Sequence, residues 1–98
     1  MRLIFAPLAE QDFQEILDYI SQDKPVAAQQ FVSRLRSACK RLSSHPLLGQ
    51  QCSEFPNRSY RRTSVGHYAI YYEVRTEAVA ILRVVHGSRD ASQIFENS

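Results

Sequence analysis

Hydrophobic residues recur along this chain with two periods, and the change between them divides it into a helical part and a strand-rich part. In the first part, Phe13, Ile16, Leu17 and Ile20 follow the spacing i, i+3, i+4 and i+7. This spacing places them on one face and predicts an amphipathic helix of about four turns. The apolar segment 2–7 ends in proline, which is typical of a short strand.

An apolar stripe predicts a second helix after the first. Asp23 can cap its first turn, and Pro25 is tolerated there because a helix leaves its first N–H groups unbonded. The helix should end within 43–46, since the residue before Pro46 is disfavoured in the helical region. The short connection between the helices predicts an antiparallel hairpin. The stripe consists of Ala28, Phe31, Val32, Leu35, Cys39 and Leu42.

The chain beyond residue 58 carries strand-like patterns. The last of them is rich in β-branched residues and ends in polar groups, as expected of a buried strand that delivers those groups to one edge of a domain. The three stretches are 59–65, 68–74 and 79–86. In the middle stretch, alternation places on one face Tyr68, Ile70, Tyr72 and Val74, and on the other Ala69, Tyr71 and Glu73.

These elements predict an α+β fold in one domain over residues 1–98. An N-terminal strand precedes the helical hairpin, and a three-stranded antiparallel meander follows it. We expect one sheet with the hairpin on one face and the other face free. Segment 46–58 lacks a period and is expected to be an irregular connection. Turns are expected at 66–67 and 75–78, and a short C-terminal helix or tail over 88–98. The pairing of the first strand stays open.

The composition, with 44% hydrophobic residues in 98, indicates a folded chain. No apolar run reaches the roughly 20 residues that a membrane span needs. No N-terminal segment resembles a signal peptide, so we expect a cytoplasmic protein. Cys39 and Cys52 are then expected to be free thiols, although a disulfide between them stays open.

Charge is distributed unevenly although the net charge is only +2. Residues 1–23 sum to −4, whereas residues 34–62 sum to +6. Two interpretations are open: acids on one helix and bases on another with no ligand, or a basic surface that faces an acidic partner or a phosphate backbone.

Several kinds of chemistry lack support in the sequence. The histidines are scattered and the cysteines lack the paired spacing of a zinc site, so we expect no metal. The isolated glycines form no phosphate-binding motif, and we expect no cofactor. No local signature supports a Ser or Cys nucleophile. We therefore assign no catalytic residue.

Arginines on strands are the remaining candidates for a site. Arg61 and Arg62 are adjacent, so their side chains should lie on opposite faces. Arg83 interrupts an apolar strand, and a guanidinium there needs a partner or a solvated face. One alternative is a pair between Arg83 and Glu73 across the hairpin. For Arg89 and Asp90, which follow that strand, the alternative is a local turn and helix cap.

Six segments together resemble the ParE branch of the RelE/ParE toxin superfamily, and they span nearly the whole chain. They are LAEQDFQEILDYI (8–20), KPVAAQQFV (24–32), LSSHPLLG (42–49), YRR (60–62), YAIYY (68–72) and RVVHGSRD (83–90). The resemblance implies the same α+β fold. It also implies the toxin of a type II toxin–antitoxin pair of the plasmid-stabilisation kind, acting in the bacterial cytoplasm as a growth inhibitor.

The resemblance implies two partners. One is a ParD-like antitoxin with an acidic C-terminal region and a ribbon-helix-helix DNA-binding N-terminal region. The other is DNA gyrase, which ParE-like members poison without being nucleases. We expect no membrane association and no direct DNA binding by the toxin alone. The candidate target-binding residues are Arg61, Arg62, Arg83, His86, Arg89 and Asp90.

RelE-like members instead cut messenger RNA on the ribosome, which defines the alternative function. Under it, Arg62 and Arg89 would stabilise charge on the phosphate, and His86 would act as a general acid or base. Phe95 stands where the RelE-like pattern has a tyrosine, and the accompanying lysines are absent. We therefore favour the gyrase inhibitor, a binding protein rather than an enzyme. A third possibility is an inert remnant that still binds its antitoxin.

Overall fold

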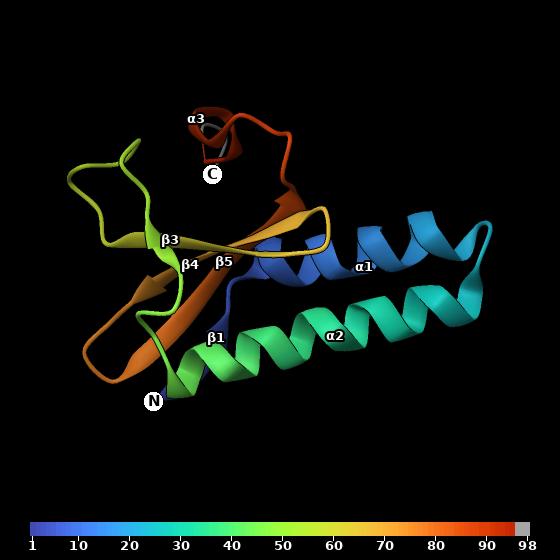
Figure 1. Ribbon diagram of the computed structural model, residues 1–98, viewed down its shortest axis with the longest axis horizontal. Coiled ribbons are helices and arrows are strands. Elements are labelled where there is room, and N and C mark those ends of the chain that lie inside the picture. Colours follow the sequence, from blue (N-terminus) through green and yellow to red (C-terminus); the bar gives the residue numbers. More distant parts are fainter. Residues whose placement is uncertain (96–98) are drawn as a thin grey trace.

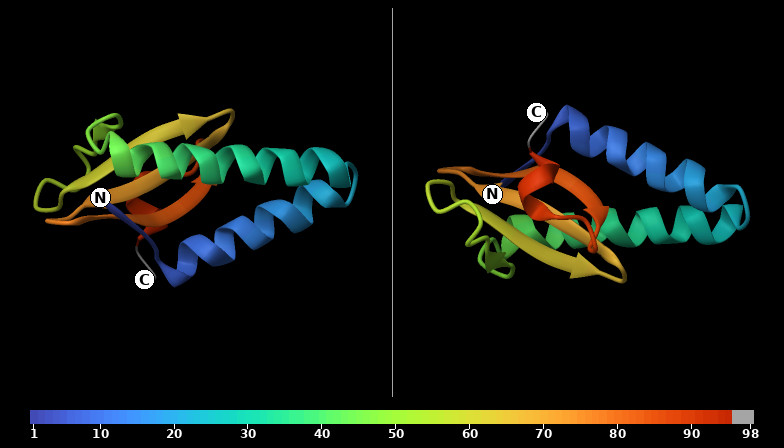
Figure 2. Two further views of the ribbon diagram at one scale, coloured as in Figure 1. Left: turned by 90° about the horizontal axis from the view of Figure 1, so that it is seen from below. Right: turned by 90° about the horizontal axis from the view of Figure 1, so that it is seen from above.

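The structure, a computed structural model, describes residues 1–95 and places a twisted sheet between a long helical hairpin and a short C-terminal helix (Figures 1 and 2). The predicted α+β fold is confirmed. Its elements are β1 (Arg2–Phe5), α1 (Pro7–Ser21), α2 (Pro25–Ser44), β2 (Gln50–Gln51), β3 (Tyr60–Val65), β4 (Tyr68–Val74), β5 (Ala78–His86) and α3 (Ala91–Ile94).

Within the described residues, the sheet has five strands in the order β1-β5-β4-β3-β2. β1 runs parallel to β5, and the other neighbours are antiparallel. This settles the pairing of the first strand, which the sequence left open. The turn between β3 and β4 contains Gly66 at φ 58°, a conformation that glycine adopts without steric cost, followed by His67.

Both long helices begin with proline, as their first-turn position permits. α2 ends at Ser44, before His45 and Pro46, as predicted. The predicted cap at Asp23 is wrong. Lys24 is the residue that precedes the helix, and it makes no side-chain cap. The reason is that the N–H groups of Asp23 and Lys24 both bond the Ile20 carbonyl, so the connection still belongs to the end of α1.

The segment expected to be irregular contains one short strand, β2, which pairs with Arg61 and Arg62 of β3. Its two glutamines are both exposed, so no apolar alternation marks it. Tertiary pairing alone makes it a strand. Farther along, Cys52 donates its N–H to the Tyr60 carbonyl at 2.9 Å and extends the same ladder.

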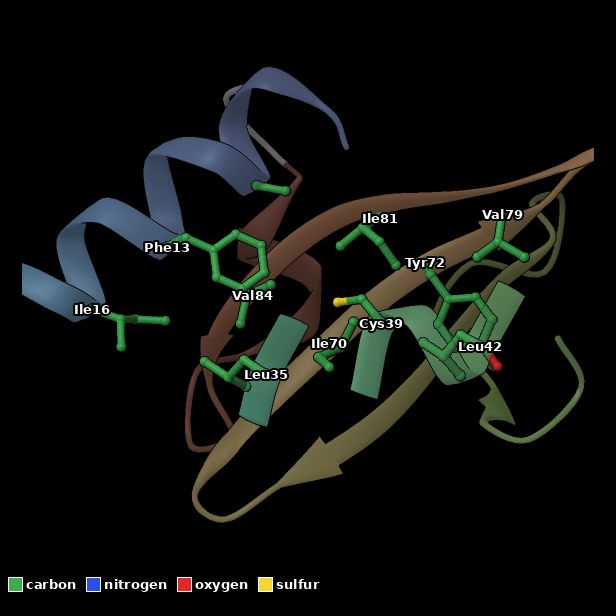
Figure 3. Close-up of a cluster of buried hydrophobic side chains, with 11 residues drawn as sticks. Phe13, Ile16, Leu35, Cys39, Leu42, Ile70, Tyr72, Val79, Ile81 and Val84 are labelled. Carbon is green, nitrogen blue, oxygen red and sulfur yellow. The ribbon is translucent and has the colours of Figure 1, made fainter. Parts of the chain in front are cut away.

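The main core lies between the sheet and the helical hairpin (Figure 3). Ile70 and Tyr72, which alternation along β4 placed on one face, both point into it. Its buried members also include Phe13, Ile16, Leu35, Cys39, Leu42, Val79, Ile81 and Val84. Cys39 and Cys52 are free thiols and belong to different clusters, one on each face of the sheet.

The second face of the sheet is not free, which corrects the expectation from sequence. A smaller cluster there buries Ala69 and Tyr71 of β4 under α3. The physical reason is that the apolar surface of Ala69 and Tyr71 is more stable when it is removed from water, and Ile94 of α3 packs over it. The tail is therefore docked as far as Phe95, whereas the expected tail residues 96–98 lie outside the described residues.

A β-bulge changes the parity of β5. Tyr72 pairs with Ile81 while Tyr71 pairs with Arg83, so Leu82 is the extra residue. Strict alternation would place Ile81 and Arg83 on one face. The bulge lets Ile81 and Val84 share the main core and turns Arg83 away from it.

The hydroxyl of Tyr72 is the polar anchor of the main core. It accepts from the Gly49 N–H at 2.8 Å and donates to the Pro46 carbonyl at 2.7 Å. Tyr72 is fully buried, so these bonds fasten the segment after α2 to the middle of the sheet. A Cβ at Gly49 would lie 2.7 Å from that hydroxyl, which explains a glycine there.

Replacing Tyr72 with Phe should therefore lower the free energy of unfolding by about 1–3 kcal/mol, because two buried main-chain groups lose their partner. Urea denaturation measures the change. Tyr19→Phe is the matched control, since Tyr19 is 72% exposed and should give a change near zero. Equal changes in the two variants would contradict the anchoring role of the Tyr72 hydroxyl.

Burial raises the pKa of the Cys39 thiol from 9.0 to about 12. Between these values the folded chain keeps a proton that the unfolded chain has lost. Stability present below pH 9.0 should thus fall as the pH rises toward 12, by a few kcal/mol at most. Cys39→Ala should show a shallower alkaline decline in denaturant titrations. Parallel pH profiles for the two proteins would count against this linkage.

Candidate functional site

Arg61 and Arg62 lie on opposite faces of β3, as predicted, and both are held by the protein itself. Arg61 donates from Nη1 to the Gly49 carbonyl at 2.6 Å. Arg62 donates from Nη1 to the Tyr71 hydroxyl at 3.1 Å and from Nη2 to the Gly87 carbonyl at 3.3 Å. The second set ties the middle of the sheet to the chain after β5.

Arg83 is a largely buried structural residue, with 14% of its side chain exposed, rather than a free surface cation. Its Nε and Nη2 donate to the two carboxylate oxygens of Asp12 at 2.8 and 3.0 Å. Its Nη1 donates to the Ile94 carbonyl at 2.8 Å, at the end of α3. One side chain therefore connects β5 to α1 on one side and to α3 on the other.

The alternative pairing of Arg83 with Glu73 is wrong. The register of the hairpin places Glu73 opposite Ala80, and Glu73 instead pairs with Arg75 at 3.1 Å and Arg58 at 3.6 Å. Arg83 meets Asp12, which lies 71 positions earlier in the chain. Because the two residues meet only in the folded chain, no short-range sequence pattern indicates this pair.

Asp12 has a second partner that explains its burial. Its Oδ2 accepts from the Val84 N–H at 2.9 Å. β1 pairs with β5 only as far as Ile81, so this N–H has no strand beside it. The carboxylate completes the edge of the sheet where β1 ends. The hydrogen bonds to Asp12 raise the pKa of Arg83 and hold its charge.

His86 ends β5 with its ring exposed. Its Nδ1 accepts from the Ser88 N–H at 3.2 Å and lies 2.7 Å from the Ser88 hydroxyl. In the neutral ring the proton is then on Nε2. The ring is also stacked 6.2 Å from His67 and lies edge-on to Tyr68 at 5.6 Å.

Asp90 and Arg89 have different roles. Asp90 caps α3 by accepting from the Ser92 N–H at 3.0 Å and the Ser92 hydroxyl at 2.9 Å, so the turn-and-cap alternative is confirmed for it. Arg89 is exposed and pairs with no carboxylate among residues 1–95. With His86 and Glu15 it lines a groove of about 240 Å³ between α1 and the end of β5.

The six predicted residues thus divide by position. His86, Arg89 and Asp90 lie around the end of β5, and Arg62 reaches the same end through Gly87. The remaining two do not join them, because Arg61 lies on the opposite face of the sheet and Arg83 is inside the fold.

Sequence reasoning missed an aromatic cluster around Phe95. The Phe95 ring lies 4.9 Å from Tyr60, 5.3 Å from Phe55 and 5.8 Å from Tyr71. The only signal in the sequence was a lone aromatic in a polar tail. These contacts help to hold the C-terminal segment on the second face of the sheet.

Within residues 1–95, no group of three or more His, Cys, Asp or Glu side chains is placed to hold a metal ion. The same part of the chain contains no helix that is long and apolar enough to span a membrane.

Removing the Asp12 carboxylate should destabilise the fold strongly. Asp12→Ala leaves a buried guanidinium and the Val84 N–H unpaired, and should cost about 3–5 kcal/mol in urea denaturation. Glu10→Ala is the control, because its pair with Arg36 is about half exposed and should cost under about 1 kcal/mol. Similar losses in both variants would refute the special role of Asp12.

The comparisons with known proteins concern the fold and the family of the chain. A chain of the solved chromosomal ParDE toxin–antitoxin system from P. aeruginosa has the same fold, with a TM-score of 0.76 at 21% identity over 88% of this chain and 95% of that chain. A comparison with curated protein sequences gave no match. Residues 3–91 match the family described as the ParE toxin of the type II toxin–antitoxin system parDE. The chain therefore belongs to the ParE toxin family of type II toxin–antitoxin systems.

Proposed function

We propose that this toxin inhibits DNA gyrase in the bacterial cytoplasm and is neutralised by a cognate ParD-like antitoxin. The observation that carries the proposal is the family match over residues 3–91. The resemblance implies gyrase as the target of ParE-like members. The proposed activity is binding, so it requires an exposed contact surface and no catalytic residues.

The exposed end of β5 is the proposed contact surface. His86 is exposed, and the Arg89 guanidinium pairs with no carboxylate among residues 1–95. Arg62, half-buried beside Gly87, would support this surface from below. Arg61 and Arg83 are left out of this surface, because their guanidinium groups are hydrogen-bonded within the fold.

The antitoxin is expected to bring an acidic C-terminal region. The long helices carry opposite charges: α1 has acids without bases, and α2 has bases without acids. An acidic segment would be attracted to α2 and repelled by α1. A ribbon-helix-helix N-terminal region of the antitoxin, as the resemblance implies, would make the contacts to DNA, so none is assigned to the toxin.

A second candidate function is ribosome-dependent cleavage of messenger RNA. One observation favours it: the Arg62 contact with Gly87 brings a guanidinium to the strand end that carries His86. Phe95 argues against it, because the RelE-like pattern has a tyrosine there and the phenyl ring packs among aromatic side chains. The gyrase function is therefore preferred.

Purified toxin should abolish supercoiling by DNA gyrase while a defined message on translating ribosomes stays intact. Message cut at ribosomal A-site codons with gyrase unaffected would reverse the assignment. If neither target responds, the chain is an antitoxin-binding remnant and the proposed activity is wrong.

Within the same assay, Arg89→Glu should weaken gyrase inhibition by about tenfold or more, because it reverses the charge at the proposed contact. His86→Ala should weaken it less. Arg75→Glu is the matched control, since Arg75 is also exposed but lies at the opposite end of β5. Equal losses for Arg89→Glu and Arg75→Glu would exclude the end of β5 as the contact.

A further inference from the structure

A groove of about 430 Å³ runs between α2 and the outer margin of β3, where Figure 2 shows the strand beside the helix. The small side chains of Ser37 and Ala38 line it on the helix side, so another main chain can approach closely. Arg34 and Arg41 also line it, and none of the acidic residues among those described does. The groove is therefore open and positively charged, and small side chains line its helix side between the two arginines.

The strand side of this groove has an unfinished hydrogen-bond ladder. β2 pairs only with Arg61 and Arg62, so within residues 1–95 β3 has no outer neighbour beyond them. The Tyr60 carbonyl bonds Cys52 on this outer side. Alternate residues of a strand direct their main-chain groups to the same side, so those of Arg62 and Ser64 also point outward. Ser64 thus presents to the groove an N–H and a C=O that have no main-chain partner in the described part of the chain.

The two arginines of the groove have no charge partner among residues 1–95. Arg36, on the same helix, pairs with Glu10 at 3.1 Å and shows that α2 cations bind carboxylates where the fold supplies them. Arg34 and Arg41 are seven positions apart, which is about two turns or roughly 10 Å along the helix. They bracket the stretch of α2 that faces Ser64.

We propose that an acidic, extended segment of the antitoxin adds to β3 at Ser64, in line with β2, and sets its carboxylates against Arg34 and Arg41. The identity of the partner rests on the proposed function, whereas the groove is a property of the toxin. Main-chain bonds to Ser64 supply attachment, and the two cations select for acidic residues. A strand advances about 3.3 Å per residue, so acids two or four positions apart match the two arginines.

The other outer strand is a poorer site for the same segment. β1 leads directly into α1, whose charged side chains are all acidic. β1 itself carries one base, Arg2, so the repulsion comes from α1, whose acids a carboxylate-rich strand on that edge would approach. Charge therefore selects the β3 side of the sheet over the β1 side.

Two measurements on the toxin with its full-length cognate antitoxin test the proposal. In the first, amide exchange of isotope-labelled toxin is followed by NMR, free and in complex. The Ser64 amide should exchange at least about tenfold more slowly in the complex. Thr63 and Val65 are internal controls, because their main-chain groups already face β4 and should change little.

In the second measurement, antitoxin affinity is compared for two double variants with the same change in net charge. Arg34→Glu with Arg41→Glu should raise Kd by about tenfold or more at low salt, and this loss should shrink at high salt. Lys24→Glu with Lys40→Glu, at exposed positions outside the groove, should have a much smaller effect. Arg34→Ala with Arg41→Ala should give an intermediate loss, and circular dichroism checks that each variant is folded.

Slower exchange at Ser64 together with the selective loss supports the proposal. A complex that forms with Ser64 exchange unchanged, or with both charge reversals equally effective, overturns the groove and leaves the antitoxin partner standing. Failure of the wild-type toxin to bind the antitoxin overturns the partner in the proposed function, and this inference with it.

Discussion

The buried pair between Asp12 and Arg83 is the contact on which the arrangement of the fold depends. Removing two charges from water is costly. The cost is offset here because both carboxylate oxygens of Asp12 and all three guanidinium nitrogens of Arg83 have hydrogen-bond partners. Asp12 also bonds the Val84 N–H, and Arg83 also bonds the Ile94 carbonyl. The pair therefore fixes where α1 crosses β5 and where α3 lies on the second face, which together define the surroundings of His86 and Arg89.

The elements with a clean period were predictable from sequence. The stripe of Phe13 and Ile16 defined α1, and alternation along β4 placed Ile70 and Tyr72 on one face, which the structure shows to be the face of the main core. These patterns arise because burial repeats with the geometry of the element itself. Proline marked the start and end of α2 for the same kind of local reason.

The features that escaped prediction all depend on partners distant in sequence. β2 is a strand only because β3 lies beside it. Asp12 is a polar residue on a helix until the fold brings Arg83 to it. Of the candidate site, sequence correctly placed Arg61 and Arg62 on opposite faces. The sequence pattern does not show that the Arg83 guanidinium is paired inside the fold, because this pairing depends on the bulged residue Leu82 and on the docking of α1.

The bulge at Leu82 divides β5 into two segments whose alternation is offset by one residue. Before the bulge, the odd-numbered residues Val79 and Ile81 face the main core. After it, the even-numbered Val84 faces the core. If β5 kept Leu82 but paired without the bulge, strict alternation would direct the Arg83 charge into the apolar core and turn Val84 out of it, whereas deletion of Leu82 would leave both on their present faces. The faces of the residues that lead to His86 thus depend on a bulged residue that lies outside the main core. Any redesign of this edge has to keep the bulge and Leu82 together or remove both.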